Sequence, residues 1–159
     1  MKGMTIFSAS CVPYAIVCGE GSHEIFSYLR TEGGDKRMYS VGPLHGRSFV
    51  VGKTGEGRYV VSKGNGLGYT SHPALNTREF GDNTWGLLLR CDAERDFVLG
   101  QEIEALGLKT NRMEYVLELE REILLPNGHT MRPALLQYDV ECPYRLCDAP
   151  FDSETSQHR

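Results

Sequence analysis

The hydrophobic and polar positions of this chain predict a domain built mostly from β-strands. Residues 4–18 are expected to form one or two short strands interrupted at Pro13, because proline cannot donate a hydrogen bond to a strand ladder. Residues 48–51 and 58–62 are rich in β-branched and aromatic side chains and flank the glycine-containing stretch 52–57. Glycines supply the positive φ values of a tight reversal, so these residues predict a β-hairpin.

The second half of the chain predicts a strand, the main helix and another hairpin. Residues 84–90 are interpreted as a strand, and residues 92–106 as the main helix, with Asp92 as its N-cap and Gly107 ending it. An approximate apolar stripe is expected to bury this helix; it consists of Phe97, Leu99, Ile103 and Leu106.

The remaining segments complete an α+β domain. We expect a short helix at 22–30, a loop at 31–47, a long loop at 64–84, a strand at 111–125, a turn at 126–128 and a returning strand at 131–140. The order strand, short helix, hairpin, strand, helix, hairpin predicts an antiparallel β-sheet with one main helix packed on it.

Composition and charge add the domain organisation and exclude some partners. The 159 residues suffice for one domain, expected at residues 1–147, with residues 148–159 as a polar and disordered tail. The formal net charge of −4 gives no basic surplus for nucleic acid. No apolar run reaches the roughly 18 residues that a membrane span needs, and the N-terminus lacks a secretory signal pattern.

The five cysteines are an odd, scattered set in a chain large enough to fold without disulfides. They favour a reduced, cytoplasmic protein. Cys142 and Cys147, with His129 upstream, offer an incomplete zinc pattern, and the expectation is therefore of idle thiols and no metal.

A lysine that ends a β-rich segment and is followed at once by glycines is the strongest chemical signal. Lys63 closes the expected strand at 58–62, and Gly64 and Gly66 follow. A lysine there is costly to bury unless an anion meets it, and glycines permit close backbone approach to a ligand. The pattern predicts a phosphate or nucleotide site; the alternative is a solvated lysine before a flexible turn.

The tripeptide at residues 52–54, Gly-Lys-Thr, does not meet the spacing of a P-loop and leads into a strand rather than a helix. Lys53 could still contact a phosphate from the hairpin turn, although a solvated hairpin tip is the simpler interpretation.

The order of a lysine-bearing strand, a helix carrying carboxylates and a pair of strands resembles the N-lobe of a protein kinase. One branch is more similar, the selenoprotein O family of kinase-like protein adenylyltransferases. That family shows a strand ending in L-K-G-x-G, an A-V-L-R strand and a helix with the motif R-E-F-L. The corresponding segments here are Val61-Ser-Lys-Gly-Asn-Gly66, Leu87-Leu-Leu-Arg90 and Arg95-Asp-Phe-Val98, within a resemblance that covers about residues 48–118.

The resemblance implies roles for individual residues. Lys63 would hold ATP phosphates with Mg²⁺ present, and Arg90 would match the family's arginine after the strand. Asp96 would take the helix position where the family has glutamate, and because aspartate is shorter, Glu102 is a substitute candidate for the ion pair with Lys63.

The chain carries neither an H-R-D-x-x-x-x-N nor a D-F-G motif, so the residues that bind metal and act as base would belong to a second lobe. The resemblance therefore implies an N-lobe of an ATP-dependent adenylyl or phosphoryl transferase, inactive without a C-lobe partner. Two alternatives stay open: a non-catalytic regulatory subunit of a split kinase-like toxin–antitoxin system, and a stand-alone α+β ligand-binding domain.

Overall fold

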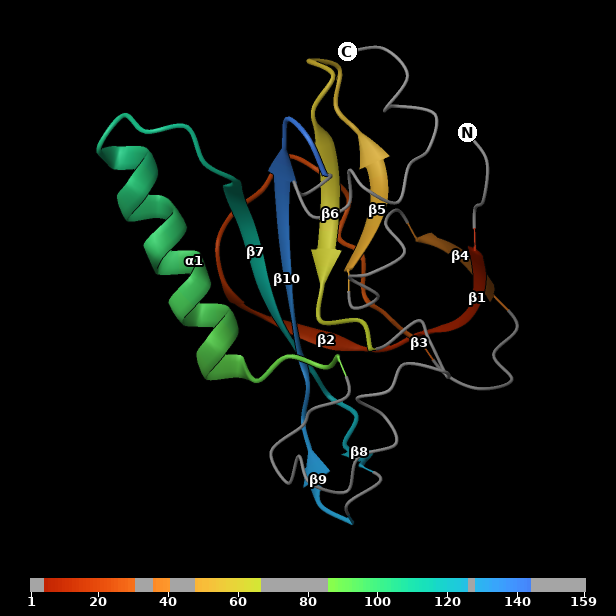
Figure 1. Cartoon of the computed structure of the whole chain (residues 1–159). Coiled ribbons are helices and arrows are strands. Elements are labelled where there is room, and N and C mark those ends of the chain that lie inside the picture. Colours follow the sequence, from red (N-terminus) through yellow and green to blue (C-terminus); the bar gives the residue numbers. More distant parts are fainter. Residues whose placement is uncertain (1–4, 31–35, 41–47, 67–85, 126–127, 144–159) are drawn as a thin grey trace, which may run out of the picture.

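The computed structural model describes residues 5–30, 36–40, 48–66, 86–125 and 128–143. Eleven elements lie in these ranges (Figure 1). They are β1 (Thr5–Cys11), β2 (Tyr14–Cys18), β3 (Tyr28–Arg30), β4 (Lys36–Ser40), β5 (Ser48–Lys53), β6 (Tyr59–Lys63), α1 (Arg90–Ala105), β7 (Arg112–Leu119), β8 (Ile123–Leu124), β9 (Thr130–Met131) and β10 (Ala134–Val140).

The centre of the fold is a five-stranded antiparallel sheet in the order β2-β7-β10-β6-β5, and α1 packs against β7 and β10. The expected α+β class is confirmed at this level. Because β6 and β7 each pair antiparallel with β10, which lies between them, β6 and β7 run parallel to each other. The connection from β6 to β7 therefore runs through α1, which crosses the face of β10 and packs on β7 and β10.

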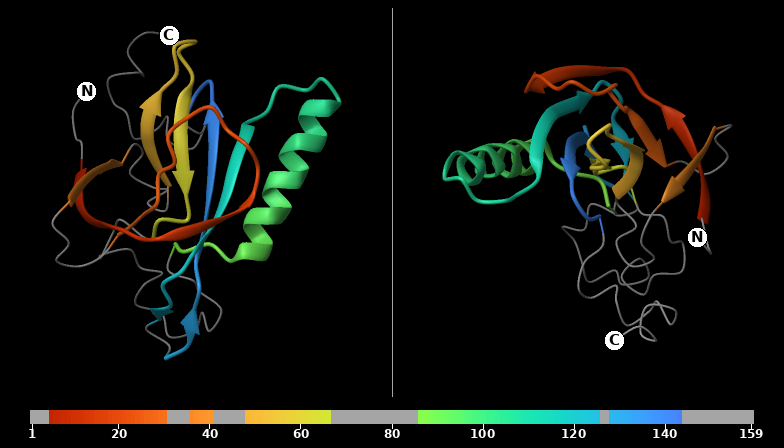
Figure 2. Two further views of the ribbon diagram at one scale, coloured as in Figure 1. Left: turned by 180° about the vertical axis from the view of Figure 1, so that it is seen from behind. Right: turned by 90° about the horizontal axis from the view of Figure 1, so that it is seen from above.

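Alternating side chains along the strands divide the core into two faces. The helix face contains the helix residues Ala93 and Phe97 with Leu88, Val116, Ala134 and Leu136. The opposite face contains Val12, Leu29, Leu87, Tyr115, Leu117, Leu119, Leu125, Met131 and Leu135. On that opposite face, the N-terminal part of the chain crosses the sheet (Figure 2, left).

The N-terminal part of the chain confirms one prediction and corrects two. The strand interrupted at Pro13 is present as β1 and β2. The short helix expected at 22–30 is wrong, because the backbone of Phe26 bonds to Gln137 Oε1 and that of Ser27 to Val12, and residues 28–30 form β3. The loop expected at 31–47 contains β4, which with β3 flanks β1 in a second sheet, while 31–35 and 41–47 lie outside the described residues.

The expected hairpin is present as β5 and β6, and the expected second hairpin as β7 and β10, with β8 and β9 in the connection between them. The strand expected at 84–90 is wrong in the part that is described. Leu87 and Leu88 form isolated bridges to Asn65 and Ala134, and Arg90 already belongs to α1.

The main helix is present but starts two residues earlier than expected, and its buried face differs. Leu89 is its N-cap, Asp92 lies in the first turn, and Gly107 ends it with a φ of +74°. Of the expected apolar stripe only Phe97 is buried; the buried positions are Ala93, Phe97 and Gly100. At 100° per residue Leu99 points about 200° away from Phe97, so the two cannot face the same sheet.

Several predictions fall on residues outside the described ranges. They concern most of the long loop at 64–84, two residues of the turn at 126–128, Cys147 and the tail at 148–159. In the described part, α1 is neither long nor apolar enough to cross a membrane.

Candidate functional site

The structure brings the predicted lysine and the predicted helix carboxylate together. Lys63 Nζ donates a hydrogen bond of 2.6 Å to Asp96 Oδ2. Lys63 pairs with Leu136 across β6 and β10, which places its side chain on the helix face, and Asp96 lies on the second turn of α1. The side chains keep 17% and 26% of their surface exposed, so this pair lies at the boundary between core and solvent. Despite its short side chain, Asp96 reaches the lysine.

Charges around Asp96 favour its ionised form. Burial alone would raise the pKa of this carboxyl, but the hydrogen bond and charge of Lys63, with a smaller contribution from Arg95, hold the pKa below its ordinary value. Arg95 donates a 3.2 Å hydrogen bond to Asp96 Oδ1. A carboxylate held between two cations stays charged at neutral pH and fixes the position of the lysine ammonium group.

The glycines after Lys63 are required by the packing of the chain itself. Gly64 has a φ of +100°, and a Cβ atom there would lie 2.7 Å from both the Ala134 carbonyl oxygen and Leu88 Cβ. Gly66, with a φ of +91°, donates a backbone hydrogen bond to the Gly86 carbonyl at 3.2 Å. Contact of these two glycines with a phosphate stays a prediction.

Asn65, between those glycines, is fully buried. Its Nδ2 donates to the Tyr28 carbonyl at 2.6 Å and to Ser62 Oγ at 3.2 Å, which ties the end of β6 to β3. Within the part of the chain that the structure describes, the amide oxygen of Asn65 has no hydrogen-bond partner. The segment after Lys63 is therefore anchored on the face opposite the helix.

The other predicted contacts do not join Lys63 in the described part of the chain. Lys53 lies at the tip of the hairpin, with its ammonium 4.9 Å from the Tyr59 ring centre, and is separated from Lys63 by the length of β6, about 13 Å. Arg90 forms ion pairs with Glu94 and Glu118. The side chain of Glu102 is exposed, and among the described ion pairs Lys63 contacts Asp96 instead.

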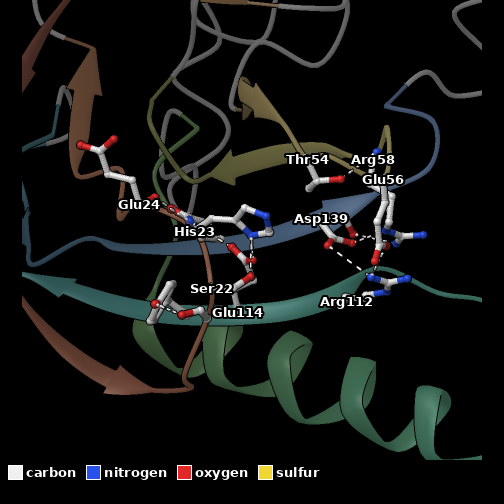
Figure 3. Close-up of polar contacts among 12 residues, drawn as sticks. Ser22, His23, Glu24, Thr54, Glu56, Arg58, Arg112, Glu114 and Asp139 are labelled. Carbon is white, nitrogen blue, oxygen red and sulfur yellow. Dashed lines mark hydrogen bonds and ion pairs between the residues drawn. The ribbon is translucent and has the colours of Figure 1, made fainter.

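A second group of polar side chains lies on the helix-free face, and the sequence did not indicate it. We call it the polar cluster; it consists of His23, Arg58, Glu114, Gln137 and Asp139. Figure 3 labels His23, Arg58, Glu114 and Asp139. His23 Nδ1 contacts Glu114 Oε1, and Gln137 Nε2 donates to Glu114 Oε2 at 3.0 Å. The Glu114 and Asp139 side chains are only 6% and 5% exposed.

Two arginines lie on the other side of Asp139 (Figure 3). The buried Arg58 donates from Nε to Asp139 Oδ1 at 2.5 Å and from Nη2 to the Asp139 carbonyl at 3.3 Å. The half-exposed Arg112 lies 4.0 Å from Asp139 Oδ2 and hydrogen-bonds Glu56, which raises the pKa of Arg112. Arg58, which the sequence placed at the start of the returning strand of a hairpin, is thus a structural partner of a buried carboxylate.

A β-bulge and two glycines assemble the polar cluster. Between β7 and β10 the register steps from Tyr115 opposite Gln137 to Met113 opposite Tyr138, so Glu114 is the extra residue of a bulge. The bulge turns Glu114 toward Gln137, away from the helix face on which strict alternation with Val116 would place it.

The glycines let the chain after β2 pass close to β7. Gly19 has a φ of +92°, and a Cβ there would lie 2.0 Å from the Glu114 carbonyl oxygen. A Cβ at Gly21 would lie 2.5 Å from the Tyr115 ring, and Tyr115 donates its hydroxyl hydrogen to the Gly21 carbonyl at 2.6 Å. Because the chain passes so close to β7, the His23 side chain contacts that of Glu114.

The chemistry of the two sites differs. The Lys63–Asp96 pair offers a fixed cation at the end of β6, whereas His23, Glu114 and Asp139 offer donor atoms that all lie within 4.8 Å of one another and form a candidate ligand set for a metal ion. The expectation of idle thiols at Cys142 and Cys147 stays untested, because Cys147 lies outside the described residues. Comparison with known proteins finds no family model that matches this chain, and no significant match to a curated protein or a solved structure.

Proposed function

We propose that this chain is the nucleotide-binding N-lobe of a kinase-like, ATP-dependent transferase. The observation that carries the proposal is the 2.6 Å hydrogen bond between Lys63 Nζ and Asp96 Oδ2. In kinase-like enzymes a strand lysine that contacts ATP phosphates is held by a helix carboxylate. The same two partners, a strand-end lysine and a helix carboxylate, meet here.

The order of elements supports this proposal. The strand that bears the lysine, β6, is followed by α1, which carries the carboxylate, and then by the antiparallel strands β7 and β10. β10 lies between β6 and β7, so α1 is held against the sheet within reach of the lysine. The expected fold class is shown by the sheet and helix; its assignment to the kinase N-lobe is part of the proposal.

In this proposal Lys63 donates hydrogen bonds to the phosphate oxygens of ATP, and Asp96 keeps the ammonium group oriented toward them. Mg²⁺ and the catalytic base belong to a second lobe, which a partner chain or further sequence would supply. The transferred group is a phosphoryl or an adenylyl group, and the acceptor is a protein. The described lobe alone would bind nucleotide weakly and would not catalyse transfer.

Proximity labelling of lysines tests the proposal even if the affinity is weak. An acyl-phosphate derivative of ATP transfers its acyl group to a lysine amine beside the bound phosphates and releases ATP. We expect mass spectrometry to find Lys63 acylated well above Lys109, which is exposed, and above Lys53, which ends β5 at the far end of the hairpin. We expect excess Mg-ATP to suppress the labelling of Lys63 alone.

Two controls make the outcome decisive. Asp96→Asn should reduce the Mg-ATP-sensitive labelling of Lys63, since the ammonium group loses the partner that orients it. Arg95→Gln removes a neighbouring charge but keeps the 2.6 Å hydrogen bond between Lys63 and Asp96, and this variant should retain most of the Mg-ATP-sensitive labelling of Lys63. If Lys63 is acylated no faster than Lys109 and Mg-ATP does not compete, the nucleotide-binding role is refuted.

A second candidate function is favoured by the exposed apolar side chains of α1. Apart from the buried Phe97, the residues of the expected stripe face solvent: Leu99 is 47% exposed, Leu106 is 76% exposed, and Ile103 is exposed with them, as are Val98 and Leu108 nearby. Exposed apolar surface of this kind is typical of a protein-binding site. In this case the chain would be a regulatory subunit of a split kinase-like system. The Lys63→Met variant should then bind the partner as well as the wild type does, whereas the double variant Leu99→Glu, Leu106→Glu should not bind it.

A further inference from the structure

The polar cluster contains three potential metal ligands that come from three separate segments. One donor atom each from His23, Glu114 and Asp139 lies within 4.8 Å of the others. His23 belongs to the segment between β2 and β3, Glu114 to β7 and Asp139 to β10. We propose that this cluster binds a divalent transition-metal ion, with Zn²⁺ the best fit, and that the ion fastens the N-terminal segment to the sheet.

The donor set selects the class of ion. One imidazole nitrogen with two carboxylate oxygens suits Zn²⁺, whereas Mg²⁺ and Ca²⁺ prefer oxygen ligands alone. A tetrahedral Zn²⁺ with bonds of about 2.0–2.1 Å holds its ligand atoms about 3.3 Å apart. Side-chain shifts of about 1 Å would bring the three donors from their present spread to that spacing, with solvent in the fourth position.

Each carboxylate is already oriented by a neighbour on one of its oxygens. Gln137 Nε2 donates to Glu114 Oε2, which leaves Oε1 beside His23 Nδ1. Arg58 Nε donates to Asp139 Oδ1, and Oδ2 has Arg112 at 4.0 Å, too far for a hydrogen bond. Outer partners that fix carboxylate ligands in this way are a regular property of metal sites.

The charge balance of the buried groups also favours a cation. Two carboxylates that are about 95% buried face one buried guanidinium, that of Arg58, while Arg112 is half exposed and shared with Glu56. A buried carboxylate without a full counter-charge is costly. A metal ion between Glu114 and Asp139 would supply the missing positive charge, and His23, which is 26% exposed, leaves a path from solvent.

Metal titration of the full chain tests the site. After removal of bound metal with a chelator, Zn²⁺ at a hundredfold excess over its Kd should raise Tm by about 5–10 °C at about pH 7.5. Co²⁺, used as a spectroscopic probe, should give visible absorption that saturates at one ion per chain. His23→Gln should weaken Zn²⁺ binding at least about a hundredfold, since it removes a direct ligand rather than an outer one.

Matched variants separate this site from adventitious binding. His129→Gln removes an exposed histidine at the β8–β9 turn and should leave both signals unchanged. Glu114→Gln keeps the side-chain shape and a hydrogen-bond acceptor for Gln137, and should also abolish binding; if it fails to fold, His23→Gln still decides the question. The proposal is overturned if His23→Gln and the wild type bind Co²⁺ equally, or if neither binds, because His23 then serves only as a hydrogen-bond partner of Glu114.

Discussion

The strength of the Lys63–Asp96 pair can be measured with a double-mutant cycle. The two charges are 2.6 Å apart, for which Coulomb's law gives about 1.6 kcal/mol in bulk water and about 6 kcal/mol at an effective dielectric constant of 20. Desolvation of the partly buried carboxylate and ordering of the long lysine side chain oppose this attraction. We therefore expect a net coupling energy of about 1–2 kcal/mol, above the ~0.2–1 kcal/mol of exposed pairs.

Urea unfolding of the wild type, Lys63→Met, Asp96→Asn and the double variant gives this coupling directly. A control cycle on Arg90 and Glu94, an exposed i,i+4 pair on the same helix, should give about 0.3–0.5 kcal/mol. If the Lys63–Asp96 coupling is no larger than that of the control, the pair does not hold the lysine in place, and the structural basis of the proposed nucleotide site is lost.

The coupling should also depend on pH in a defined direction. The folded-state pKa of Asp96 lies below its ordinary value of 3.8, so the pair's stabilisation is fully present above the unfolded-state pKa. It should begin to decline below about pH 5, where the unfolded chain takes up the proton, and be lost as the pH falls through the folded-state pKa. A coupling that grows as the pH falls from 7 to about 4 would contradict the assigned ion pair.

Two further predictions address packing, and both can be checked by chemical denaturation. Gly64→Ala should destabilise the fold by about 2–4 kcal/mol, because it combines a positive φ with contacts of 2.7 Å, whereas Gly55→Ala, with nothing within 4 Å, should change stability by less than about 0.5 kcal/mol. Phe97→Ala should lower the free energy of unfolding by about 3–5 kcal/mol, because Phe97 is buried, whereas Leu106→Ala, at a 76% exposed position, should lower it by less than about 0.5 kcal/mol. Similar losses at both positions would mean that the buried face of α1 is assigned wrongly.

The elements that sequence patterns predicted well are those with strong local signals. The hairpin around residues 52–57 has glycines that a tight reversal needs, and the main helix has a glycine that ends it. Lys63 and Asp96 lie 33 positions apart, and their meeting was expected only through the resemblance of the element order to a kinase N-lobe. Local pattern alone does not show that α1 returns across β10.

The segment at residues 22–30 was misread because tertiary hydrogen bonds override its local pattern. Ser22 resembles a helix N-cap, but Phe26 and Ser27 direct their backbone groups to Gln137 and Val12. A backbone amide that bonds to another segment is not available to a helical turn. Helix propensity depends on neighbouring residues only, so it does not reflect a hydrogen-bond partner such as Gln137, more than a hundred positions away from Phe26.

Glu114 was missed for a different reason. Strict alternation places it on the same face as Val116, and the bulge opposite Gln137 turns it to the other face. The sequence gives no sign of this extra residue. A usable signal lies instead in Gly19 and Gly21, whose neighbours leave no room for a Cβ and whose spacing marks a close passage of the chain.

The two proposed sites lie on neighbouring strands of one sheet, β6 for Lys63 and β10 for Asp139, but on opposite faces, which makes them separable by experiment. Lys63 lies opposite Leu136 on the helix face, while Gln137, the next residue of β10, orients Glu114 on the other face. Side chains on opposite faces of a strand share backbone but few contacts, so perturbations of the two sites should be nearly additive. His23→Gln should therefore remove metal binding without changing the Lys63–Asp96 coupling. If it does change that coupling, β10 transmits the state of the N-terminal segment to the lysine, and the two faces form one functional unit.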